Sequence, residues 1–251
     1  MLYDVTIVGG GIIGCAIARE LMRYRLRVIL LEKECEVGFG TSKANSGIIH
    51  AGHHSSSTTV KGSLEWAGNQ MWDKLCEELD FGFKRIGELM VATNDAQVAE
   101  LEKHKKQGEE RGVTGLEIWD AERIRKEEPN LSEDIIAALY APTAGVINPY
   151  EACFALIDNA RINGLEISVE NPVIGISAND DTLTVKTARD LIHTRFVLNV
   201  AGVYADEIAE MAGVGDFTIR TRKGEEYLLD KRLQGMVKRL IFPCPDPVTK
   251  S

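Results

Sequence analysis

The pattern of apolar and polar positions predicts buried strands that alternate with amphipathic helices. Apolar runs over residues 5–8 and 28–31 each have the length of a buried strand, and a helical pattern lies between them. Three glycines, Gly9, Gly11 and Gly14, directly follow the first run. A strand, a glycine turn, a helix and a second strand in this order predict a parallel βαβ unit.

The same reasoning extends along the rest of the chain. Helices are predicted over residues 60–79, 95–111, 120–127 and 151–163, and strands over residues 81–93, 135–140, 145–147, 165–170, 173–177, 182–187 and 191–200. In the first of these helices, Leu64, Met71, Leu75 and Leu79 share one side, with Trp72 beside them, which predicts core packing. The first βαβ unit and the strands before Ala201 should form one sheet, which residues 80–145 interrupt as an inserted domain.

Composition and charge narrow the class of protein. The 251 residues, 44% hydrophobic and 27% charged, suit one large or two small globular domains. The net charge of -9 argues against a nucleic-acid partner. The 5 cysteines form no CxxC pair and no zinc-like spacing, so we predict no metal site and a reducing, cytoplasmic setting. The sequence has no leader pattern and no apolar run long enough to span a bilayer, although a peripheral membrane contact stays open.

The glycine turn predicts a pyrophosphate site. Gly9 permits the tight turn, Gly11 lets the phosphates approach the backbone, and Gly14 lets the helix pack against the strand. The helix begins at Ile12 and Ile13, and its free N–H groups and positive dipole end should face the anion. Glu32, followed by Lys33, ends the second strand, where a carboxylate accepts hydrogen bonds from an adenosine ribose without a 2′-phosphate.

The segment after the second strand indicates a cofactor larger than NAD. Small residues and hydroxyl or amide donors follow one another there, as in an extended loop around a long cofactor: Gly38, Gly40, Thr41, Ser42, Asn45, Ser46 and Gly47. At these residues the chain resembles FAD-dependent oxidoreductases of the D-amino-acid oxidase-like superfamily. Within it, the resemblance is to the group containing L-2-hydroxyglutarate dehydrogenase or oxidase and anaerobic-type glycerol-3-phosphate dehydrogenase. The segments that carry it are NSGIIHAG (45–52), AGVINPYEAC (144–153), RFVLNVAGVYAD (195–206), RKGEEYLL (222–229) and LIFPCPDP (240–247).

The resemblance implies an α/β fold with a Rossmann-like FAD-binding domain of the D-amino-acid oxidase type and an inserted, discontinuous α+β substrate domain. The FAD-binding domain is expected over residues 1–80 and 146–215, and the substrate domain over residues 81–145 and 216–251, with strands at 216–229 and 240–242. Relatives continue further, so both domains are expected to be incomplete, as in a truncated gene product or a fragment. The predicted cofactor-binding residues are Gly9, Gly11, Ile12, Ile13, Gly14, Glu32, Lys33, Thr41, Ser42, Asn45, Ser46, Gly47, Val173, Ala201 and Gly202.

The chemistry implied is hydride removal from a hydroxyl-bearing carbon to flavin N5, with a base that takes the hydroxyl proton. The resemblance assigns the base role to His50, with His53 and His54 as competitors on the same loop. Arg222 is the expected anchor for a small anionic substrate, and Tyr227 either donates a hydrogen bond to it or packs.

The substrate and partners are less defined. A 2-hydroxy acid such as L-2-hydroxyglutarate is slightly favoured, because glycerol-phosphate enzymes tend to carry arginine near the flavin histidine, where this chain has Ala44 and His54. Glycerol 3-phosphate is the close alternative, an amine is less favoured, and a non-catalytic flavin-binding fragment is the rival from another class. The electron acceptor could be a quinone or a partner protein, and the sequence predicts neither the oligomeric state nor covalent attachment of FAD.

Overall fold

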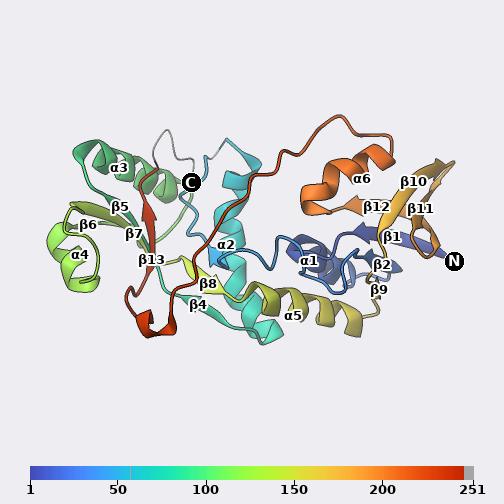
Figure 1. The fold of residues 1–251 in the computed structure, drawn as a ribbon, viewed down its shortest axis with the longest axis horizontal. Helices are drawn as coiled ribbons and strands as arrows, with labels where there is room; N and C mark the ends of the chain where they lie inside the picture. Colours follow the sequence, from blue (N-terminus) through green and yellow to red (C-terminus); the bar gives the residue numbers. More distant parts are fainter. Residues whose placement is uncertain (57, 246–251) are drawn as a thin grey trace. The chain divides into compact units, whose positions relative to one another are not determined.

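The computed structural model describes residues 1–56 and 58–245 and divides the chain into two units (Figure 1). Unit 1 comprises Met1–Ser46, Leu79–Phe81 and Asn148–Glu225, and unit 2 comprises Gly47–Glu78, Gly82–Ile147 and Glu226–Ser251. Residues 246–251, which include the end of the segment LIFPCPDP and of the predicted substrate domain, lie outside the described residues.

A six-stranded sheet in the order β10-β11-β12-β1-β2-β9 organises unit 1. Its elements are β1 (Leu2–Val8), α1 (Ile12–Leu21), β2 (Val28–Leu31), α5 (Pro149–Ile162), β9 (Glu166–Ser168), β10 (Val173–Asn179), β11 (Thr182–Thr187), β12 (Leu191–Asn199), a 3-10 turn (Gly202–Tyr204) and α6 (Ala205–Met211). Strands β12, β1, β2 and β9 run parallel, and β10 and β11 continue the sheet antiparallel beside β12. The predicted parallel βαβ unit is therefore present, and β12, the strand before Ala201, joins its sheet.

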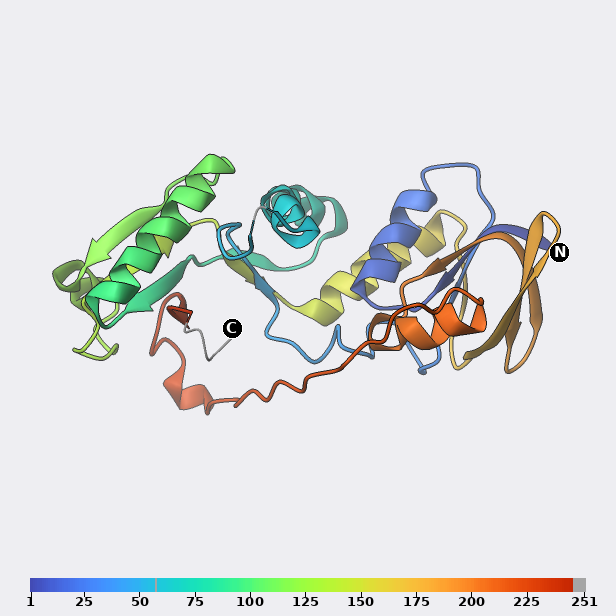
Figure 2. The same cartoon turned by 90° about the horizontal axis from the view of Figure 1, so that it is seen from above.

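Both faces of the parallel strands are covered in unit 1. Ile29 and Leu31 belong to one apolar cluster with Ile208 of α6. Because side chains alternate along a strand, Val28 and Leu30 point to the opposite face. Figure 2 shows α1 and α5 on that side and α6 on the other. Coverage on two faces explains why β2 is a continuous apolar run rather than an alternating one.

Unit 2 contains two smaller sheets. Its elements are β3 (Ile48–Ile49), α2 (Val60–Leu79), β4 (Phe83–Arg85), β5 (Glu88–Ala92), α3 (Asp95–Glu110), β6 (Glu117–Asp120), α4 (Ala121–Glu127), β7 (Ala137–Ala141), β8 (Gly145–Ile147), a 3-10 turn (Lys231–Leu233) and β13 (Leu240–Pro243). One sheet has the order β13-β5-β7-β6 and the other the order β3-β8-β4. Met90 of β5 packs with Leu101 of α3, and its neighbour Leu89 packs with Ile124 of α4, so this unit too has helices on both faces of a sheet.

Helix α2 has the predicted bounds but not the predicted buried face. Leu64 and Met71, expected in a core, are 61% and 64% exposed, while Gly62 and Asn69 are buried. The Asn69 amide donates to the backbone oxygens of His50 (2.8 Å) and Thr143 (3.0 Å). The helix is thus held through small and polar residues, which an apolar pattern cannot reveal, and the prediction of core packing for Leu64 and Met71 was wrong.

The strand predicted over residues 216–229 was also wrong. Only irregular chain is found there, and Tyr227 and Leu228 are almost fully exposed. A strand needs a neighbour to satisfy its backbone groups, and no described segment pairs with these residues. The strand predicted over residues 81–93 is divided into β4 and β5 by Gly87, whose φ of +72° interrupts the extended conformation. Strand β6 and helix α6 were not predicted.

The two units differ from the predicted domain boundaries mainly at residues 47–78 and 216–225, and also at residues 81 and 146–147. The first of these segments lies in unit 2 because β3 pairs with β8 and Asn69 binds the backbone of Thr143. The second lies in unit 1, where the backbone N–H of Ile219 donates to Asp206 (2.8 Å). In the described part of the chain, no helix is both long and apolar enough to cross a membrane.

Candidate cofactor pocket and histidine–glutamate cluster

The glycine bend between β1 and α1 has the geometry that the motif predicts. Gly9 has a φ of +114°, and a Cβ added there would lie 2.5 Å from the backbone oxygen of Val200. A Cβ on Gly14 would overlap the carbonyl oxygen of Gly9. Any side chain at either position would push the helix away from the strands, so these two glycines set how close α1 lies to β1 and β12.

A cavity of about 580 Å³ lies over this bend in unit 1, within the size range of small-molecule sites. Twelve of the fifteen residues predicted to bind the cofactor line it: Gly9, Gly11, Ile12, Ile13, Glu32, Lys33, Thr41, Ser42, Asn45, Val173, Ala201 and Gly202. Gly14, Ser46 and Gly47 do not line the cavity. For Gly14 the reason is its place under the helix, where it contacts Gly9 and Val200.

Glu32 is held by backbone hydrogen bonds at the end of β2. Its Oε2 accepts the N–H of Gly10 (2.6 Å), its Oε1 accepts the N–H of Glu34 (2.9 Å), and the side chain is buried. Each carboxylate oxygen has a second lone pair. The carboxylate is therefore oriented and can still accept a hydroxyl, which fits the predicted contact with a ribose.

The loop after β2 folds over the start of α1. Ser42 Oγ accepts the N–H of Ile12 (2.9 Å), and the Asn45 amide donates to the backbone oxygen of Ser42 (2.7 Å). Gly11, the N-cap, offers no side chain, so most of the N–H groups in the first turn have no side-chain cap. A helix start of this kind, next to a cavity, is suited to bind phosphate oxygens.

Twelve further residues line the pocket and were not named as cofactor-binding residues, although Gly40 belongs to the loop expected around the cofactor. They are Val8, Leu31, Glu34, Gly40, Asn171, Pro172, Val200, Val203, Tyr204, Glu207, Ile208 and Met211. Asn171 is informative because its Oδ1 is buried without a hydrogen-bond partner among the described residues, while its Nδ2 donates to Ser168 Oγ (3.0 Å). A ligand hydrogen-bond donor in the pocket would satisfy this oxygen. The resemblance pointed to this segment, because backbone groups of residues 169–173 were expected to meet the adenine, although Val173 alone was named for that contact.

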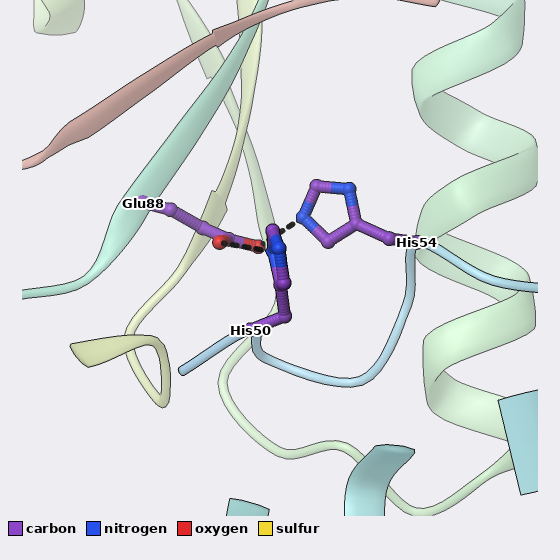
Figure 3. A group of neighbouring side chains, drawn as sticks. All are labelled: His50, His54 and Glu88. Atoms are coloured by element: carbon purple, nitrogen blue, oxygen red, sulfur yellow. Dashed lines mark hydrogen bonds and ion pairs between the residues drawn. The ribbon is translucent and has the colours of Figure 1, made fainter. Parts of the chain in front are cut away.

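In unit 2, four side chains form a second group of interest, which we call the histidine–glutamate cluster: His50, His53, His54 and Glu88. The histidines lie on the loop after β3, and Glu88 is the first residue of β5 (Figure 3). Glu88 Oε1 lies 2.7 Å from His53 Nε2 and 2.8 Å from His54 Nε2. Glu88 Oε2 lies 3.9 Å from His50 Nδ1, which is an ion-pair distance and too long for a hydrogen bond.

The environment of the cluster shifts two pKa values. Burial alone would raise the pKa of Glu88, but His50, His53 and His54 together outweigh burial and hold this pKa well below its usual value. Burial lowers the pKa of His54, and the attraction of Glu88 opposes that shift only in part. Glu88 is therefore an ionised carboxylate that the structure buries completely.

Contacts around the cluster hold its loop in place. His104 Nδ1 (3.0 Å) and Gln107 Nε2 (2.8 Å), both on α3, contact the backbone oxygen of His53. The rings of His50 and His54 lie 5.5 Å and 5.3 Å from that of Phe242 on β13. The structure thus brings together His50 and its two predicted competitors, with a carboxylate that sequence reasoning did not include.

The predicted substrate anchors do not join this group. Arg222 lies in unit 1 and is exposed, and Tyr227 lies in unit 2 and is 92% exposed. Their predicted roles rest on the resemblance alone.

The features of unit 1 define a dinucleotide-binding fold: a parallel sheet, a glycine bend that admits no side chain, an open helix start and a buried acid after the second strand. Comparison with known proteins identifies the family. The family model described as FAD dependent oxidoreductase matches residues 4–251. The chain therefore belongs to the FAD-dependent oxidoreductase family, which confirms the predicted family, fold class and cofactor.

Individual relatives agree with this assignment. A glycerol 3-phosphate dehydrogenase of Caloramator mitchellensis is 45% identical over 249 residues, which cover 99% of this chain and 52% of the relative. An L-2-hydroxyglutarate dehydrogenase of Indibacter alkaliphilus is 29% identical over 98% of this chain and 62% of its own length. The dithionite-reduced, FAD-bound structure of L-alpha-glycerophosphate oxidase from Mycoplasma pneumoniae superposes with a TM-score of 0.87 at 29% identity, covering 100% of this chain and 67% of that one. The chain thus spans about half to two thirds of the length of these relatives.

Proposed function

We propose that this chain binds FAD in the pocket of unit 1 and belongs to an enzyme that oxidises a hydroxyl-bearing carbon of a small anionic substrate. The pocket carries this proposal, because its glycine bend, its open helix start and Glu32 together suit the ADP half of a dinucleotide. Glycerol 3-phosphate is the favoured substrate. L-2-hydroxyglutarate is the second candidate.

The residues of the pocket have distinct roles in this proposal. The helix start at Gly11, Ile12 and Ile13 holds the pyrophosphate, and Glu32 accepts the ribose hydroxyls. Val173 contacts the adenine, while Ala201 and Gly202 approach the phosphates from the end of β12. Thr41, Ser42 and Asn45 supply donors from the loop, and Lys33 stacks over Tyr204 at 3.4 Å from the ring centroid. Ser46 and Gly47 stay in the proposal on the resemblance alone.

FAD supplies the hydride acceptor, at N5 of the flavin. The proton of the substrate hydroxyl then needs a base, and the resemblance of NSGIIHAG assigns this role to His50. Imidazole suits the task because its unperturbed pKa of about 6.5 lets it accept and release a proton near neutral pH. His53 is a weaker candidate, because it is fully buried with its Nε2 held by Glu88.

The substrate preference comes from the relatives. Identity is 45% to the glycerol 3-phosphate dehydrogenase and 29% to the L-2-hydroxyglutarate dehydrogenase. This difference moves the preference away from the hydroxy acid that Ala44 and His54 slightly favoured. Either substrate is an anion, and Arg222 remains the proposed anchor, with Tyr227 as the proposed hydrogen-bond donor.

Two finer points belong to the same proposal. A cytoplasmic location is supported by the five cysteines, all of which are free in the structure. The reduced flavin must pass its electrons to an acceptor, for which we propose a quinone, reached by a peripheral membrane contact, or a partner protein.

The test uses the full chain purified without a tag, with FAD added under anaerobic conditions and a chelator present. We expect a yellow protein whose visible flavin band is bleached by glycerol 3-phosphate more readily than by L-2-hydroxyglutarate. Glycine and L-proline serve as amine controls. His50→Ala should keep the flavin colour and lose the bleaching.

Each other result changes the proposal in a defined way. A colourless protein that does not take up FAD contradicts the pocket assignment. A yellow protein that no substrate bleaches supports the rival view of a non-catalytic flavin-binding fragment. Unchanged bleaching in His50→Ala removes His50 from the base role.

A further inference from the structure

The histidine–glutamate cluster contains a buried carboxyl group that is surrounded by imidazoles. Glu88 is fully buried. Over residues 1–56 and 58–245, its side-chain partners are imidazoles, with no lysine or arginine among them. Carboxylate and imidazole groups are both ligands of divalent metal ions.

Three buried atoms in the cluster lack a hydrogen-bond partner in the described part of the chain: Glu88 Oε2, His50 Nδ1 and His53 Nδ1. Glu88 Oε2 and His50 Nδ1 face each other across 3.9 Å. Native structures pair nearly all buried polar atoms, so two unpaired atoms at one place indicate a missing partner.

The geometry suits a metal ion as that partner. One ligand atom each from His50, His54 and Glu88 lies within 4.8 Å of the others (Figure 3). In a tetrahedral zinc site with metal–ligand bonds near 2.0 Å, neighbouring ligand atoms lie about 3.3 Å apart. The two separations involve different carboxylate oxygens: Oε1 lies 2.8 Å from His54 Nε2, and Oε2 lies 3.9 Å from His50 Nδ1. A rotation of the carboxylate is therefore needed before one of its oxygens meets both imidazoles at an ion.

We propose that His50, His54 and Glu88 bind a divalent transition-metal ion of the zinc class, with the fourth position open to water or a small anion. Two imidazoles and one carboxylate are a donor set that such ions prefer. His53 acts as the outer partner, because its Nε2 binds Glu88 Oε1 and so orients the carboxylate. The contacts of His104 and Gln107 with the backbone of His53 hold this partner in position.

The site has a consequence that rests on the proposed function. A metal ion bound to Nδ1 of His50 keeps the proton on Nε2, because a neutral imidazole has one lone pair and one N–H. A metal-loaded chain could then not use His50 as the base. Zinc would therefore inhibit substrate oxidation, and a chelator would restore it.

The test measures metal binding directly, on the tag-free 251-residue chain stripped by a chelator and free of FAD and substrate. Isothermal titration with Zn²⁺ should show one ion per chain, and Co²⁺ should give the visible absorption bands of a low-symmetry nitrogen and oxygen site. Glu88→Gln and His54→Gln should each weaken Zn²⁺ binding at least about 10-fold. Both residues are proposed as direct ligands, and the loss of a residue that only orients a ligand already weakens binding by about that factor. His193→Gln is the matched control. This histidine lies on β12 of unit 1, hydrogen-bonded to Thr184 (3.1 Å), and its loss should leave binding unchanged.

The outcomes separate this inference from the proposed function. If Zn²⁺ does not bind at one per chain, or if Glu88→Gln and His54→Gln bind as well as the unchanged chain, the metal site is wrong even if substrate still bleaches the flavin. If Zn²⁺ binds without slowing flavin reduction, the site stands and the base role of His50 fails. Circular dichroism checks that each variant folds. Should Glu88→Gln fail to fold, His54→Gln decides, because the His54 side chain is partly exposed and tolerates replacement better.

Discussion

The pocket of unit 1 and the histidine–glutamate cluster of unit 2 are built in opposite ways. The pocket depends on what is absent, because Gly9 and Gly14 leave space that any side chain would fill. Glu32, at its wall, is held by two backbone N–H groups. The cluster depends on what is present, three imidazoles packed around a buried carboxyl group. Backbone geometry thus shapes the first site, and contacts between side chains shape the second.

This contrast makes Glu88→Ala the variant with the largest expected effect. It leaves the imidazoles of His53 and His54 without their acceptor inside the protein. Breaking a buried charged group away from its partners costs about 3–5 kcal/mol. Urea unfolding of the metal-free chain should show a decrease of that size in the free energy of unfolding.

Glu100→Ala is the control, since Glu100 pairs with Lys103 at the surface. Its loss should change the free energy of unfolding by less than about 1 kcal/mol. If both variants lost the same free energy of unfolding, the carboxylate of Glu88 would not stabilise the cluster.

The pocket is tested next by adding one methyl group. In Gly14→Ala the new Cβ overlaps the carbonyl oxygen of Gly9, so α1 must move away from the strands. Overpacking of this kind costs about 1–3 kcal/mol and should also abolish FAD retention, measured by flavin absorbance after gel filtration. Gly40→Ala is the matched control in the same pocket, because a Cβ there meets nothing within 4 Å. If Gly14→Ala retains FAD as well as Gly40→Ala, the bend does not set the cofactor site.

The two sites also differ in how far the sequence predicts them. The glycine bend, Glu32 and the loop to Asn45 follow one another within a short stretch, and local backbone rules decide their arrangement. Nine of the twelve predicted residues that line the cavity come from this stretch, and the other three, Val173, Ala201 and Gly202, were predicted from the resemblance. Asn171, which follows the edge strand β9, and Tyr204, which follows β12 beside β1, were not predicted, because they lie far from the glycine bend in the chain and only the complete fold places them in the pocket.

The cluster could not be predicted from spacing. His50, His53 and His54 are adjacent in the chain, but Glu88 arrives from β5, 34 residues beyond His54. Glu88 also begins a strand that is otherwise apolar, where an acid is expected to be exposed. The prediction of no metal site came from the cysteine spacing, which carries no information about histidine and glutamate ligands. Similarly, the pattern of α2 predicted its bounds but not its contacts, because Asn69 rather than an apolar stripe fixes it.

A milder change in the pocket separates its charge from its shape. Glu32→Gln keeps the size of the side chain and one acceptor oxygen. It removes the negative charge that strengthens the hydrogen bonds from the ribose hydroxyls. We expect the dissociation constant for FAD to rise about 10-fold, equivalent to about 1.4 kcal/mol, measured by fluorescence titration of the flavin. Glu34→Gln, at the same pocket wall, should stay within about twofold because Glu34 pairs with Lys33 near the surface. Equal weakening by both variants would show that the overall negative charge, not the ribose contact, matters.

The smallest effect on stability is expected at Arg222, where the resemblance predicts a role and the structure shows an exposed side chain on an irregular segment. Arg222→Ala should change the free energy of unfolding by less than about 0.5 kcal/mol, and FAD binding should not change. The half-saturating concentration of glycerol 3-phosphate in the bleaching assay should still rise, because an arginine fork binds a phosphate in two places. Lys223→Ala is the control, since Lys223 already pairs with Glu225 at 2.6 Å. If the two variants behave alike, Arg222 is an exposed surface residue that does not bind the substrate. Another residue must then anchor the anion.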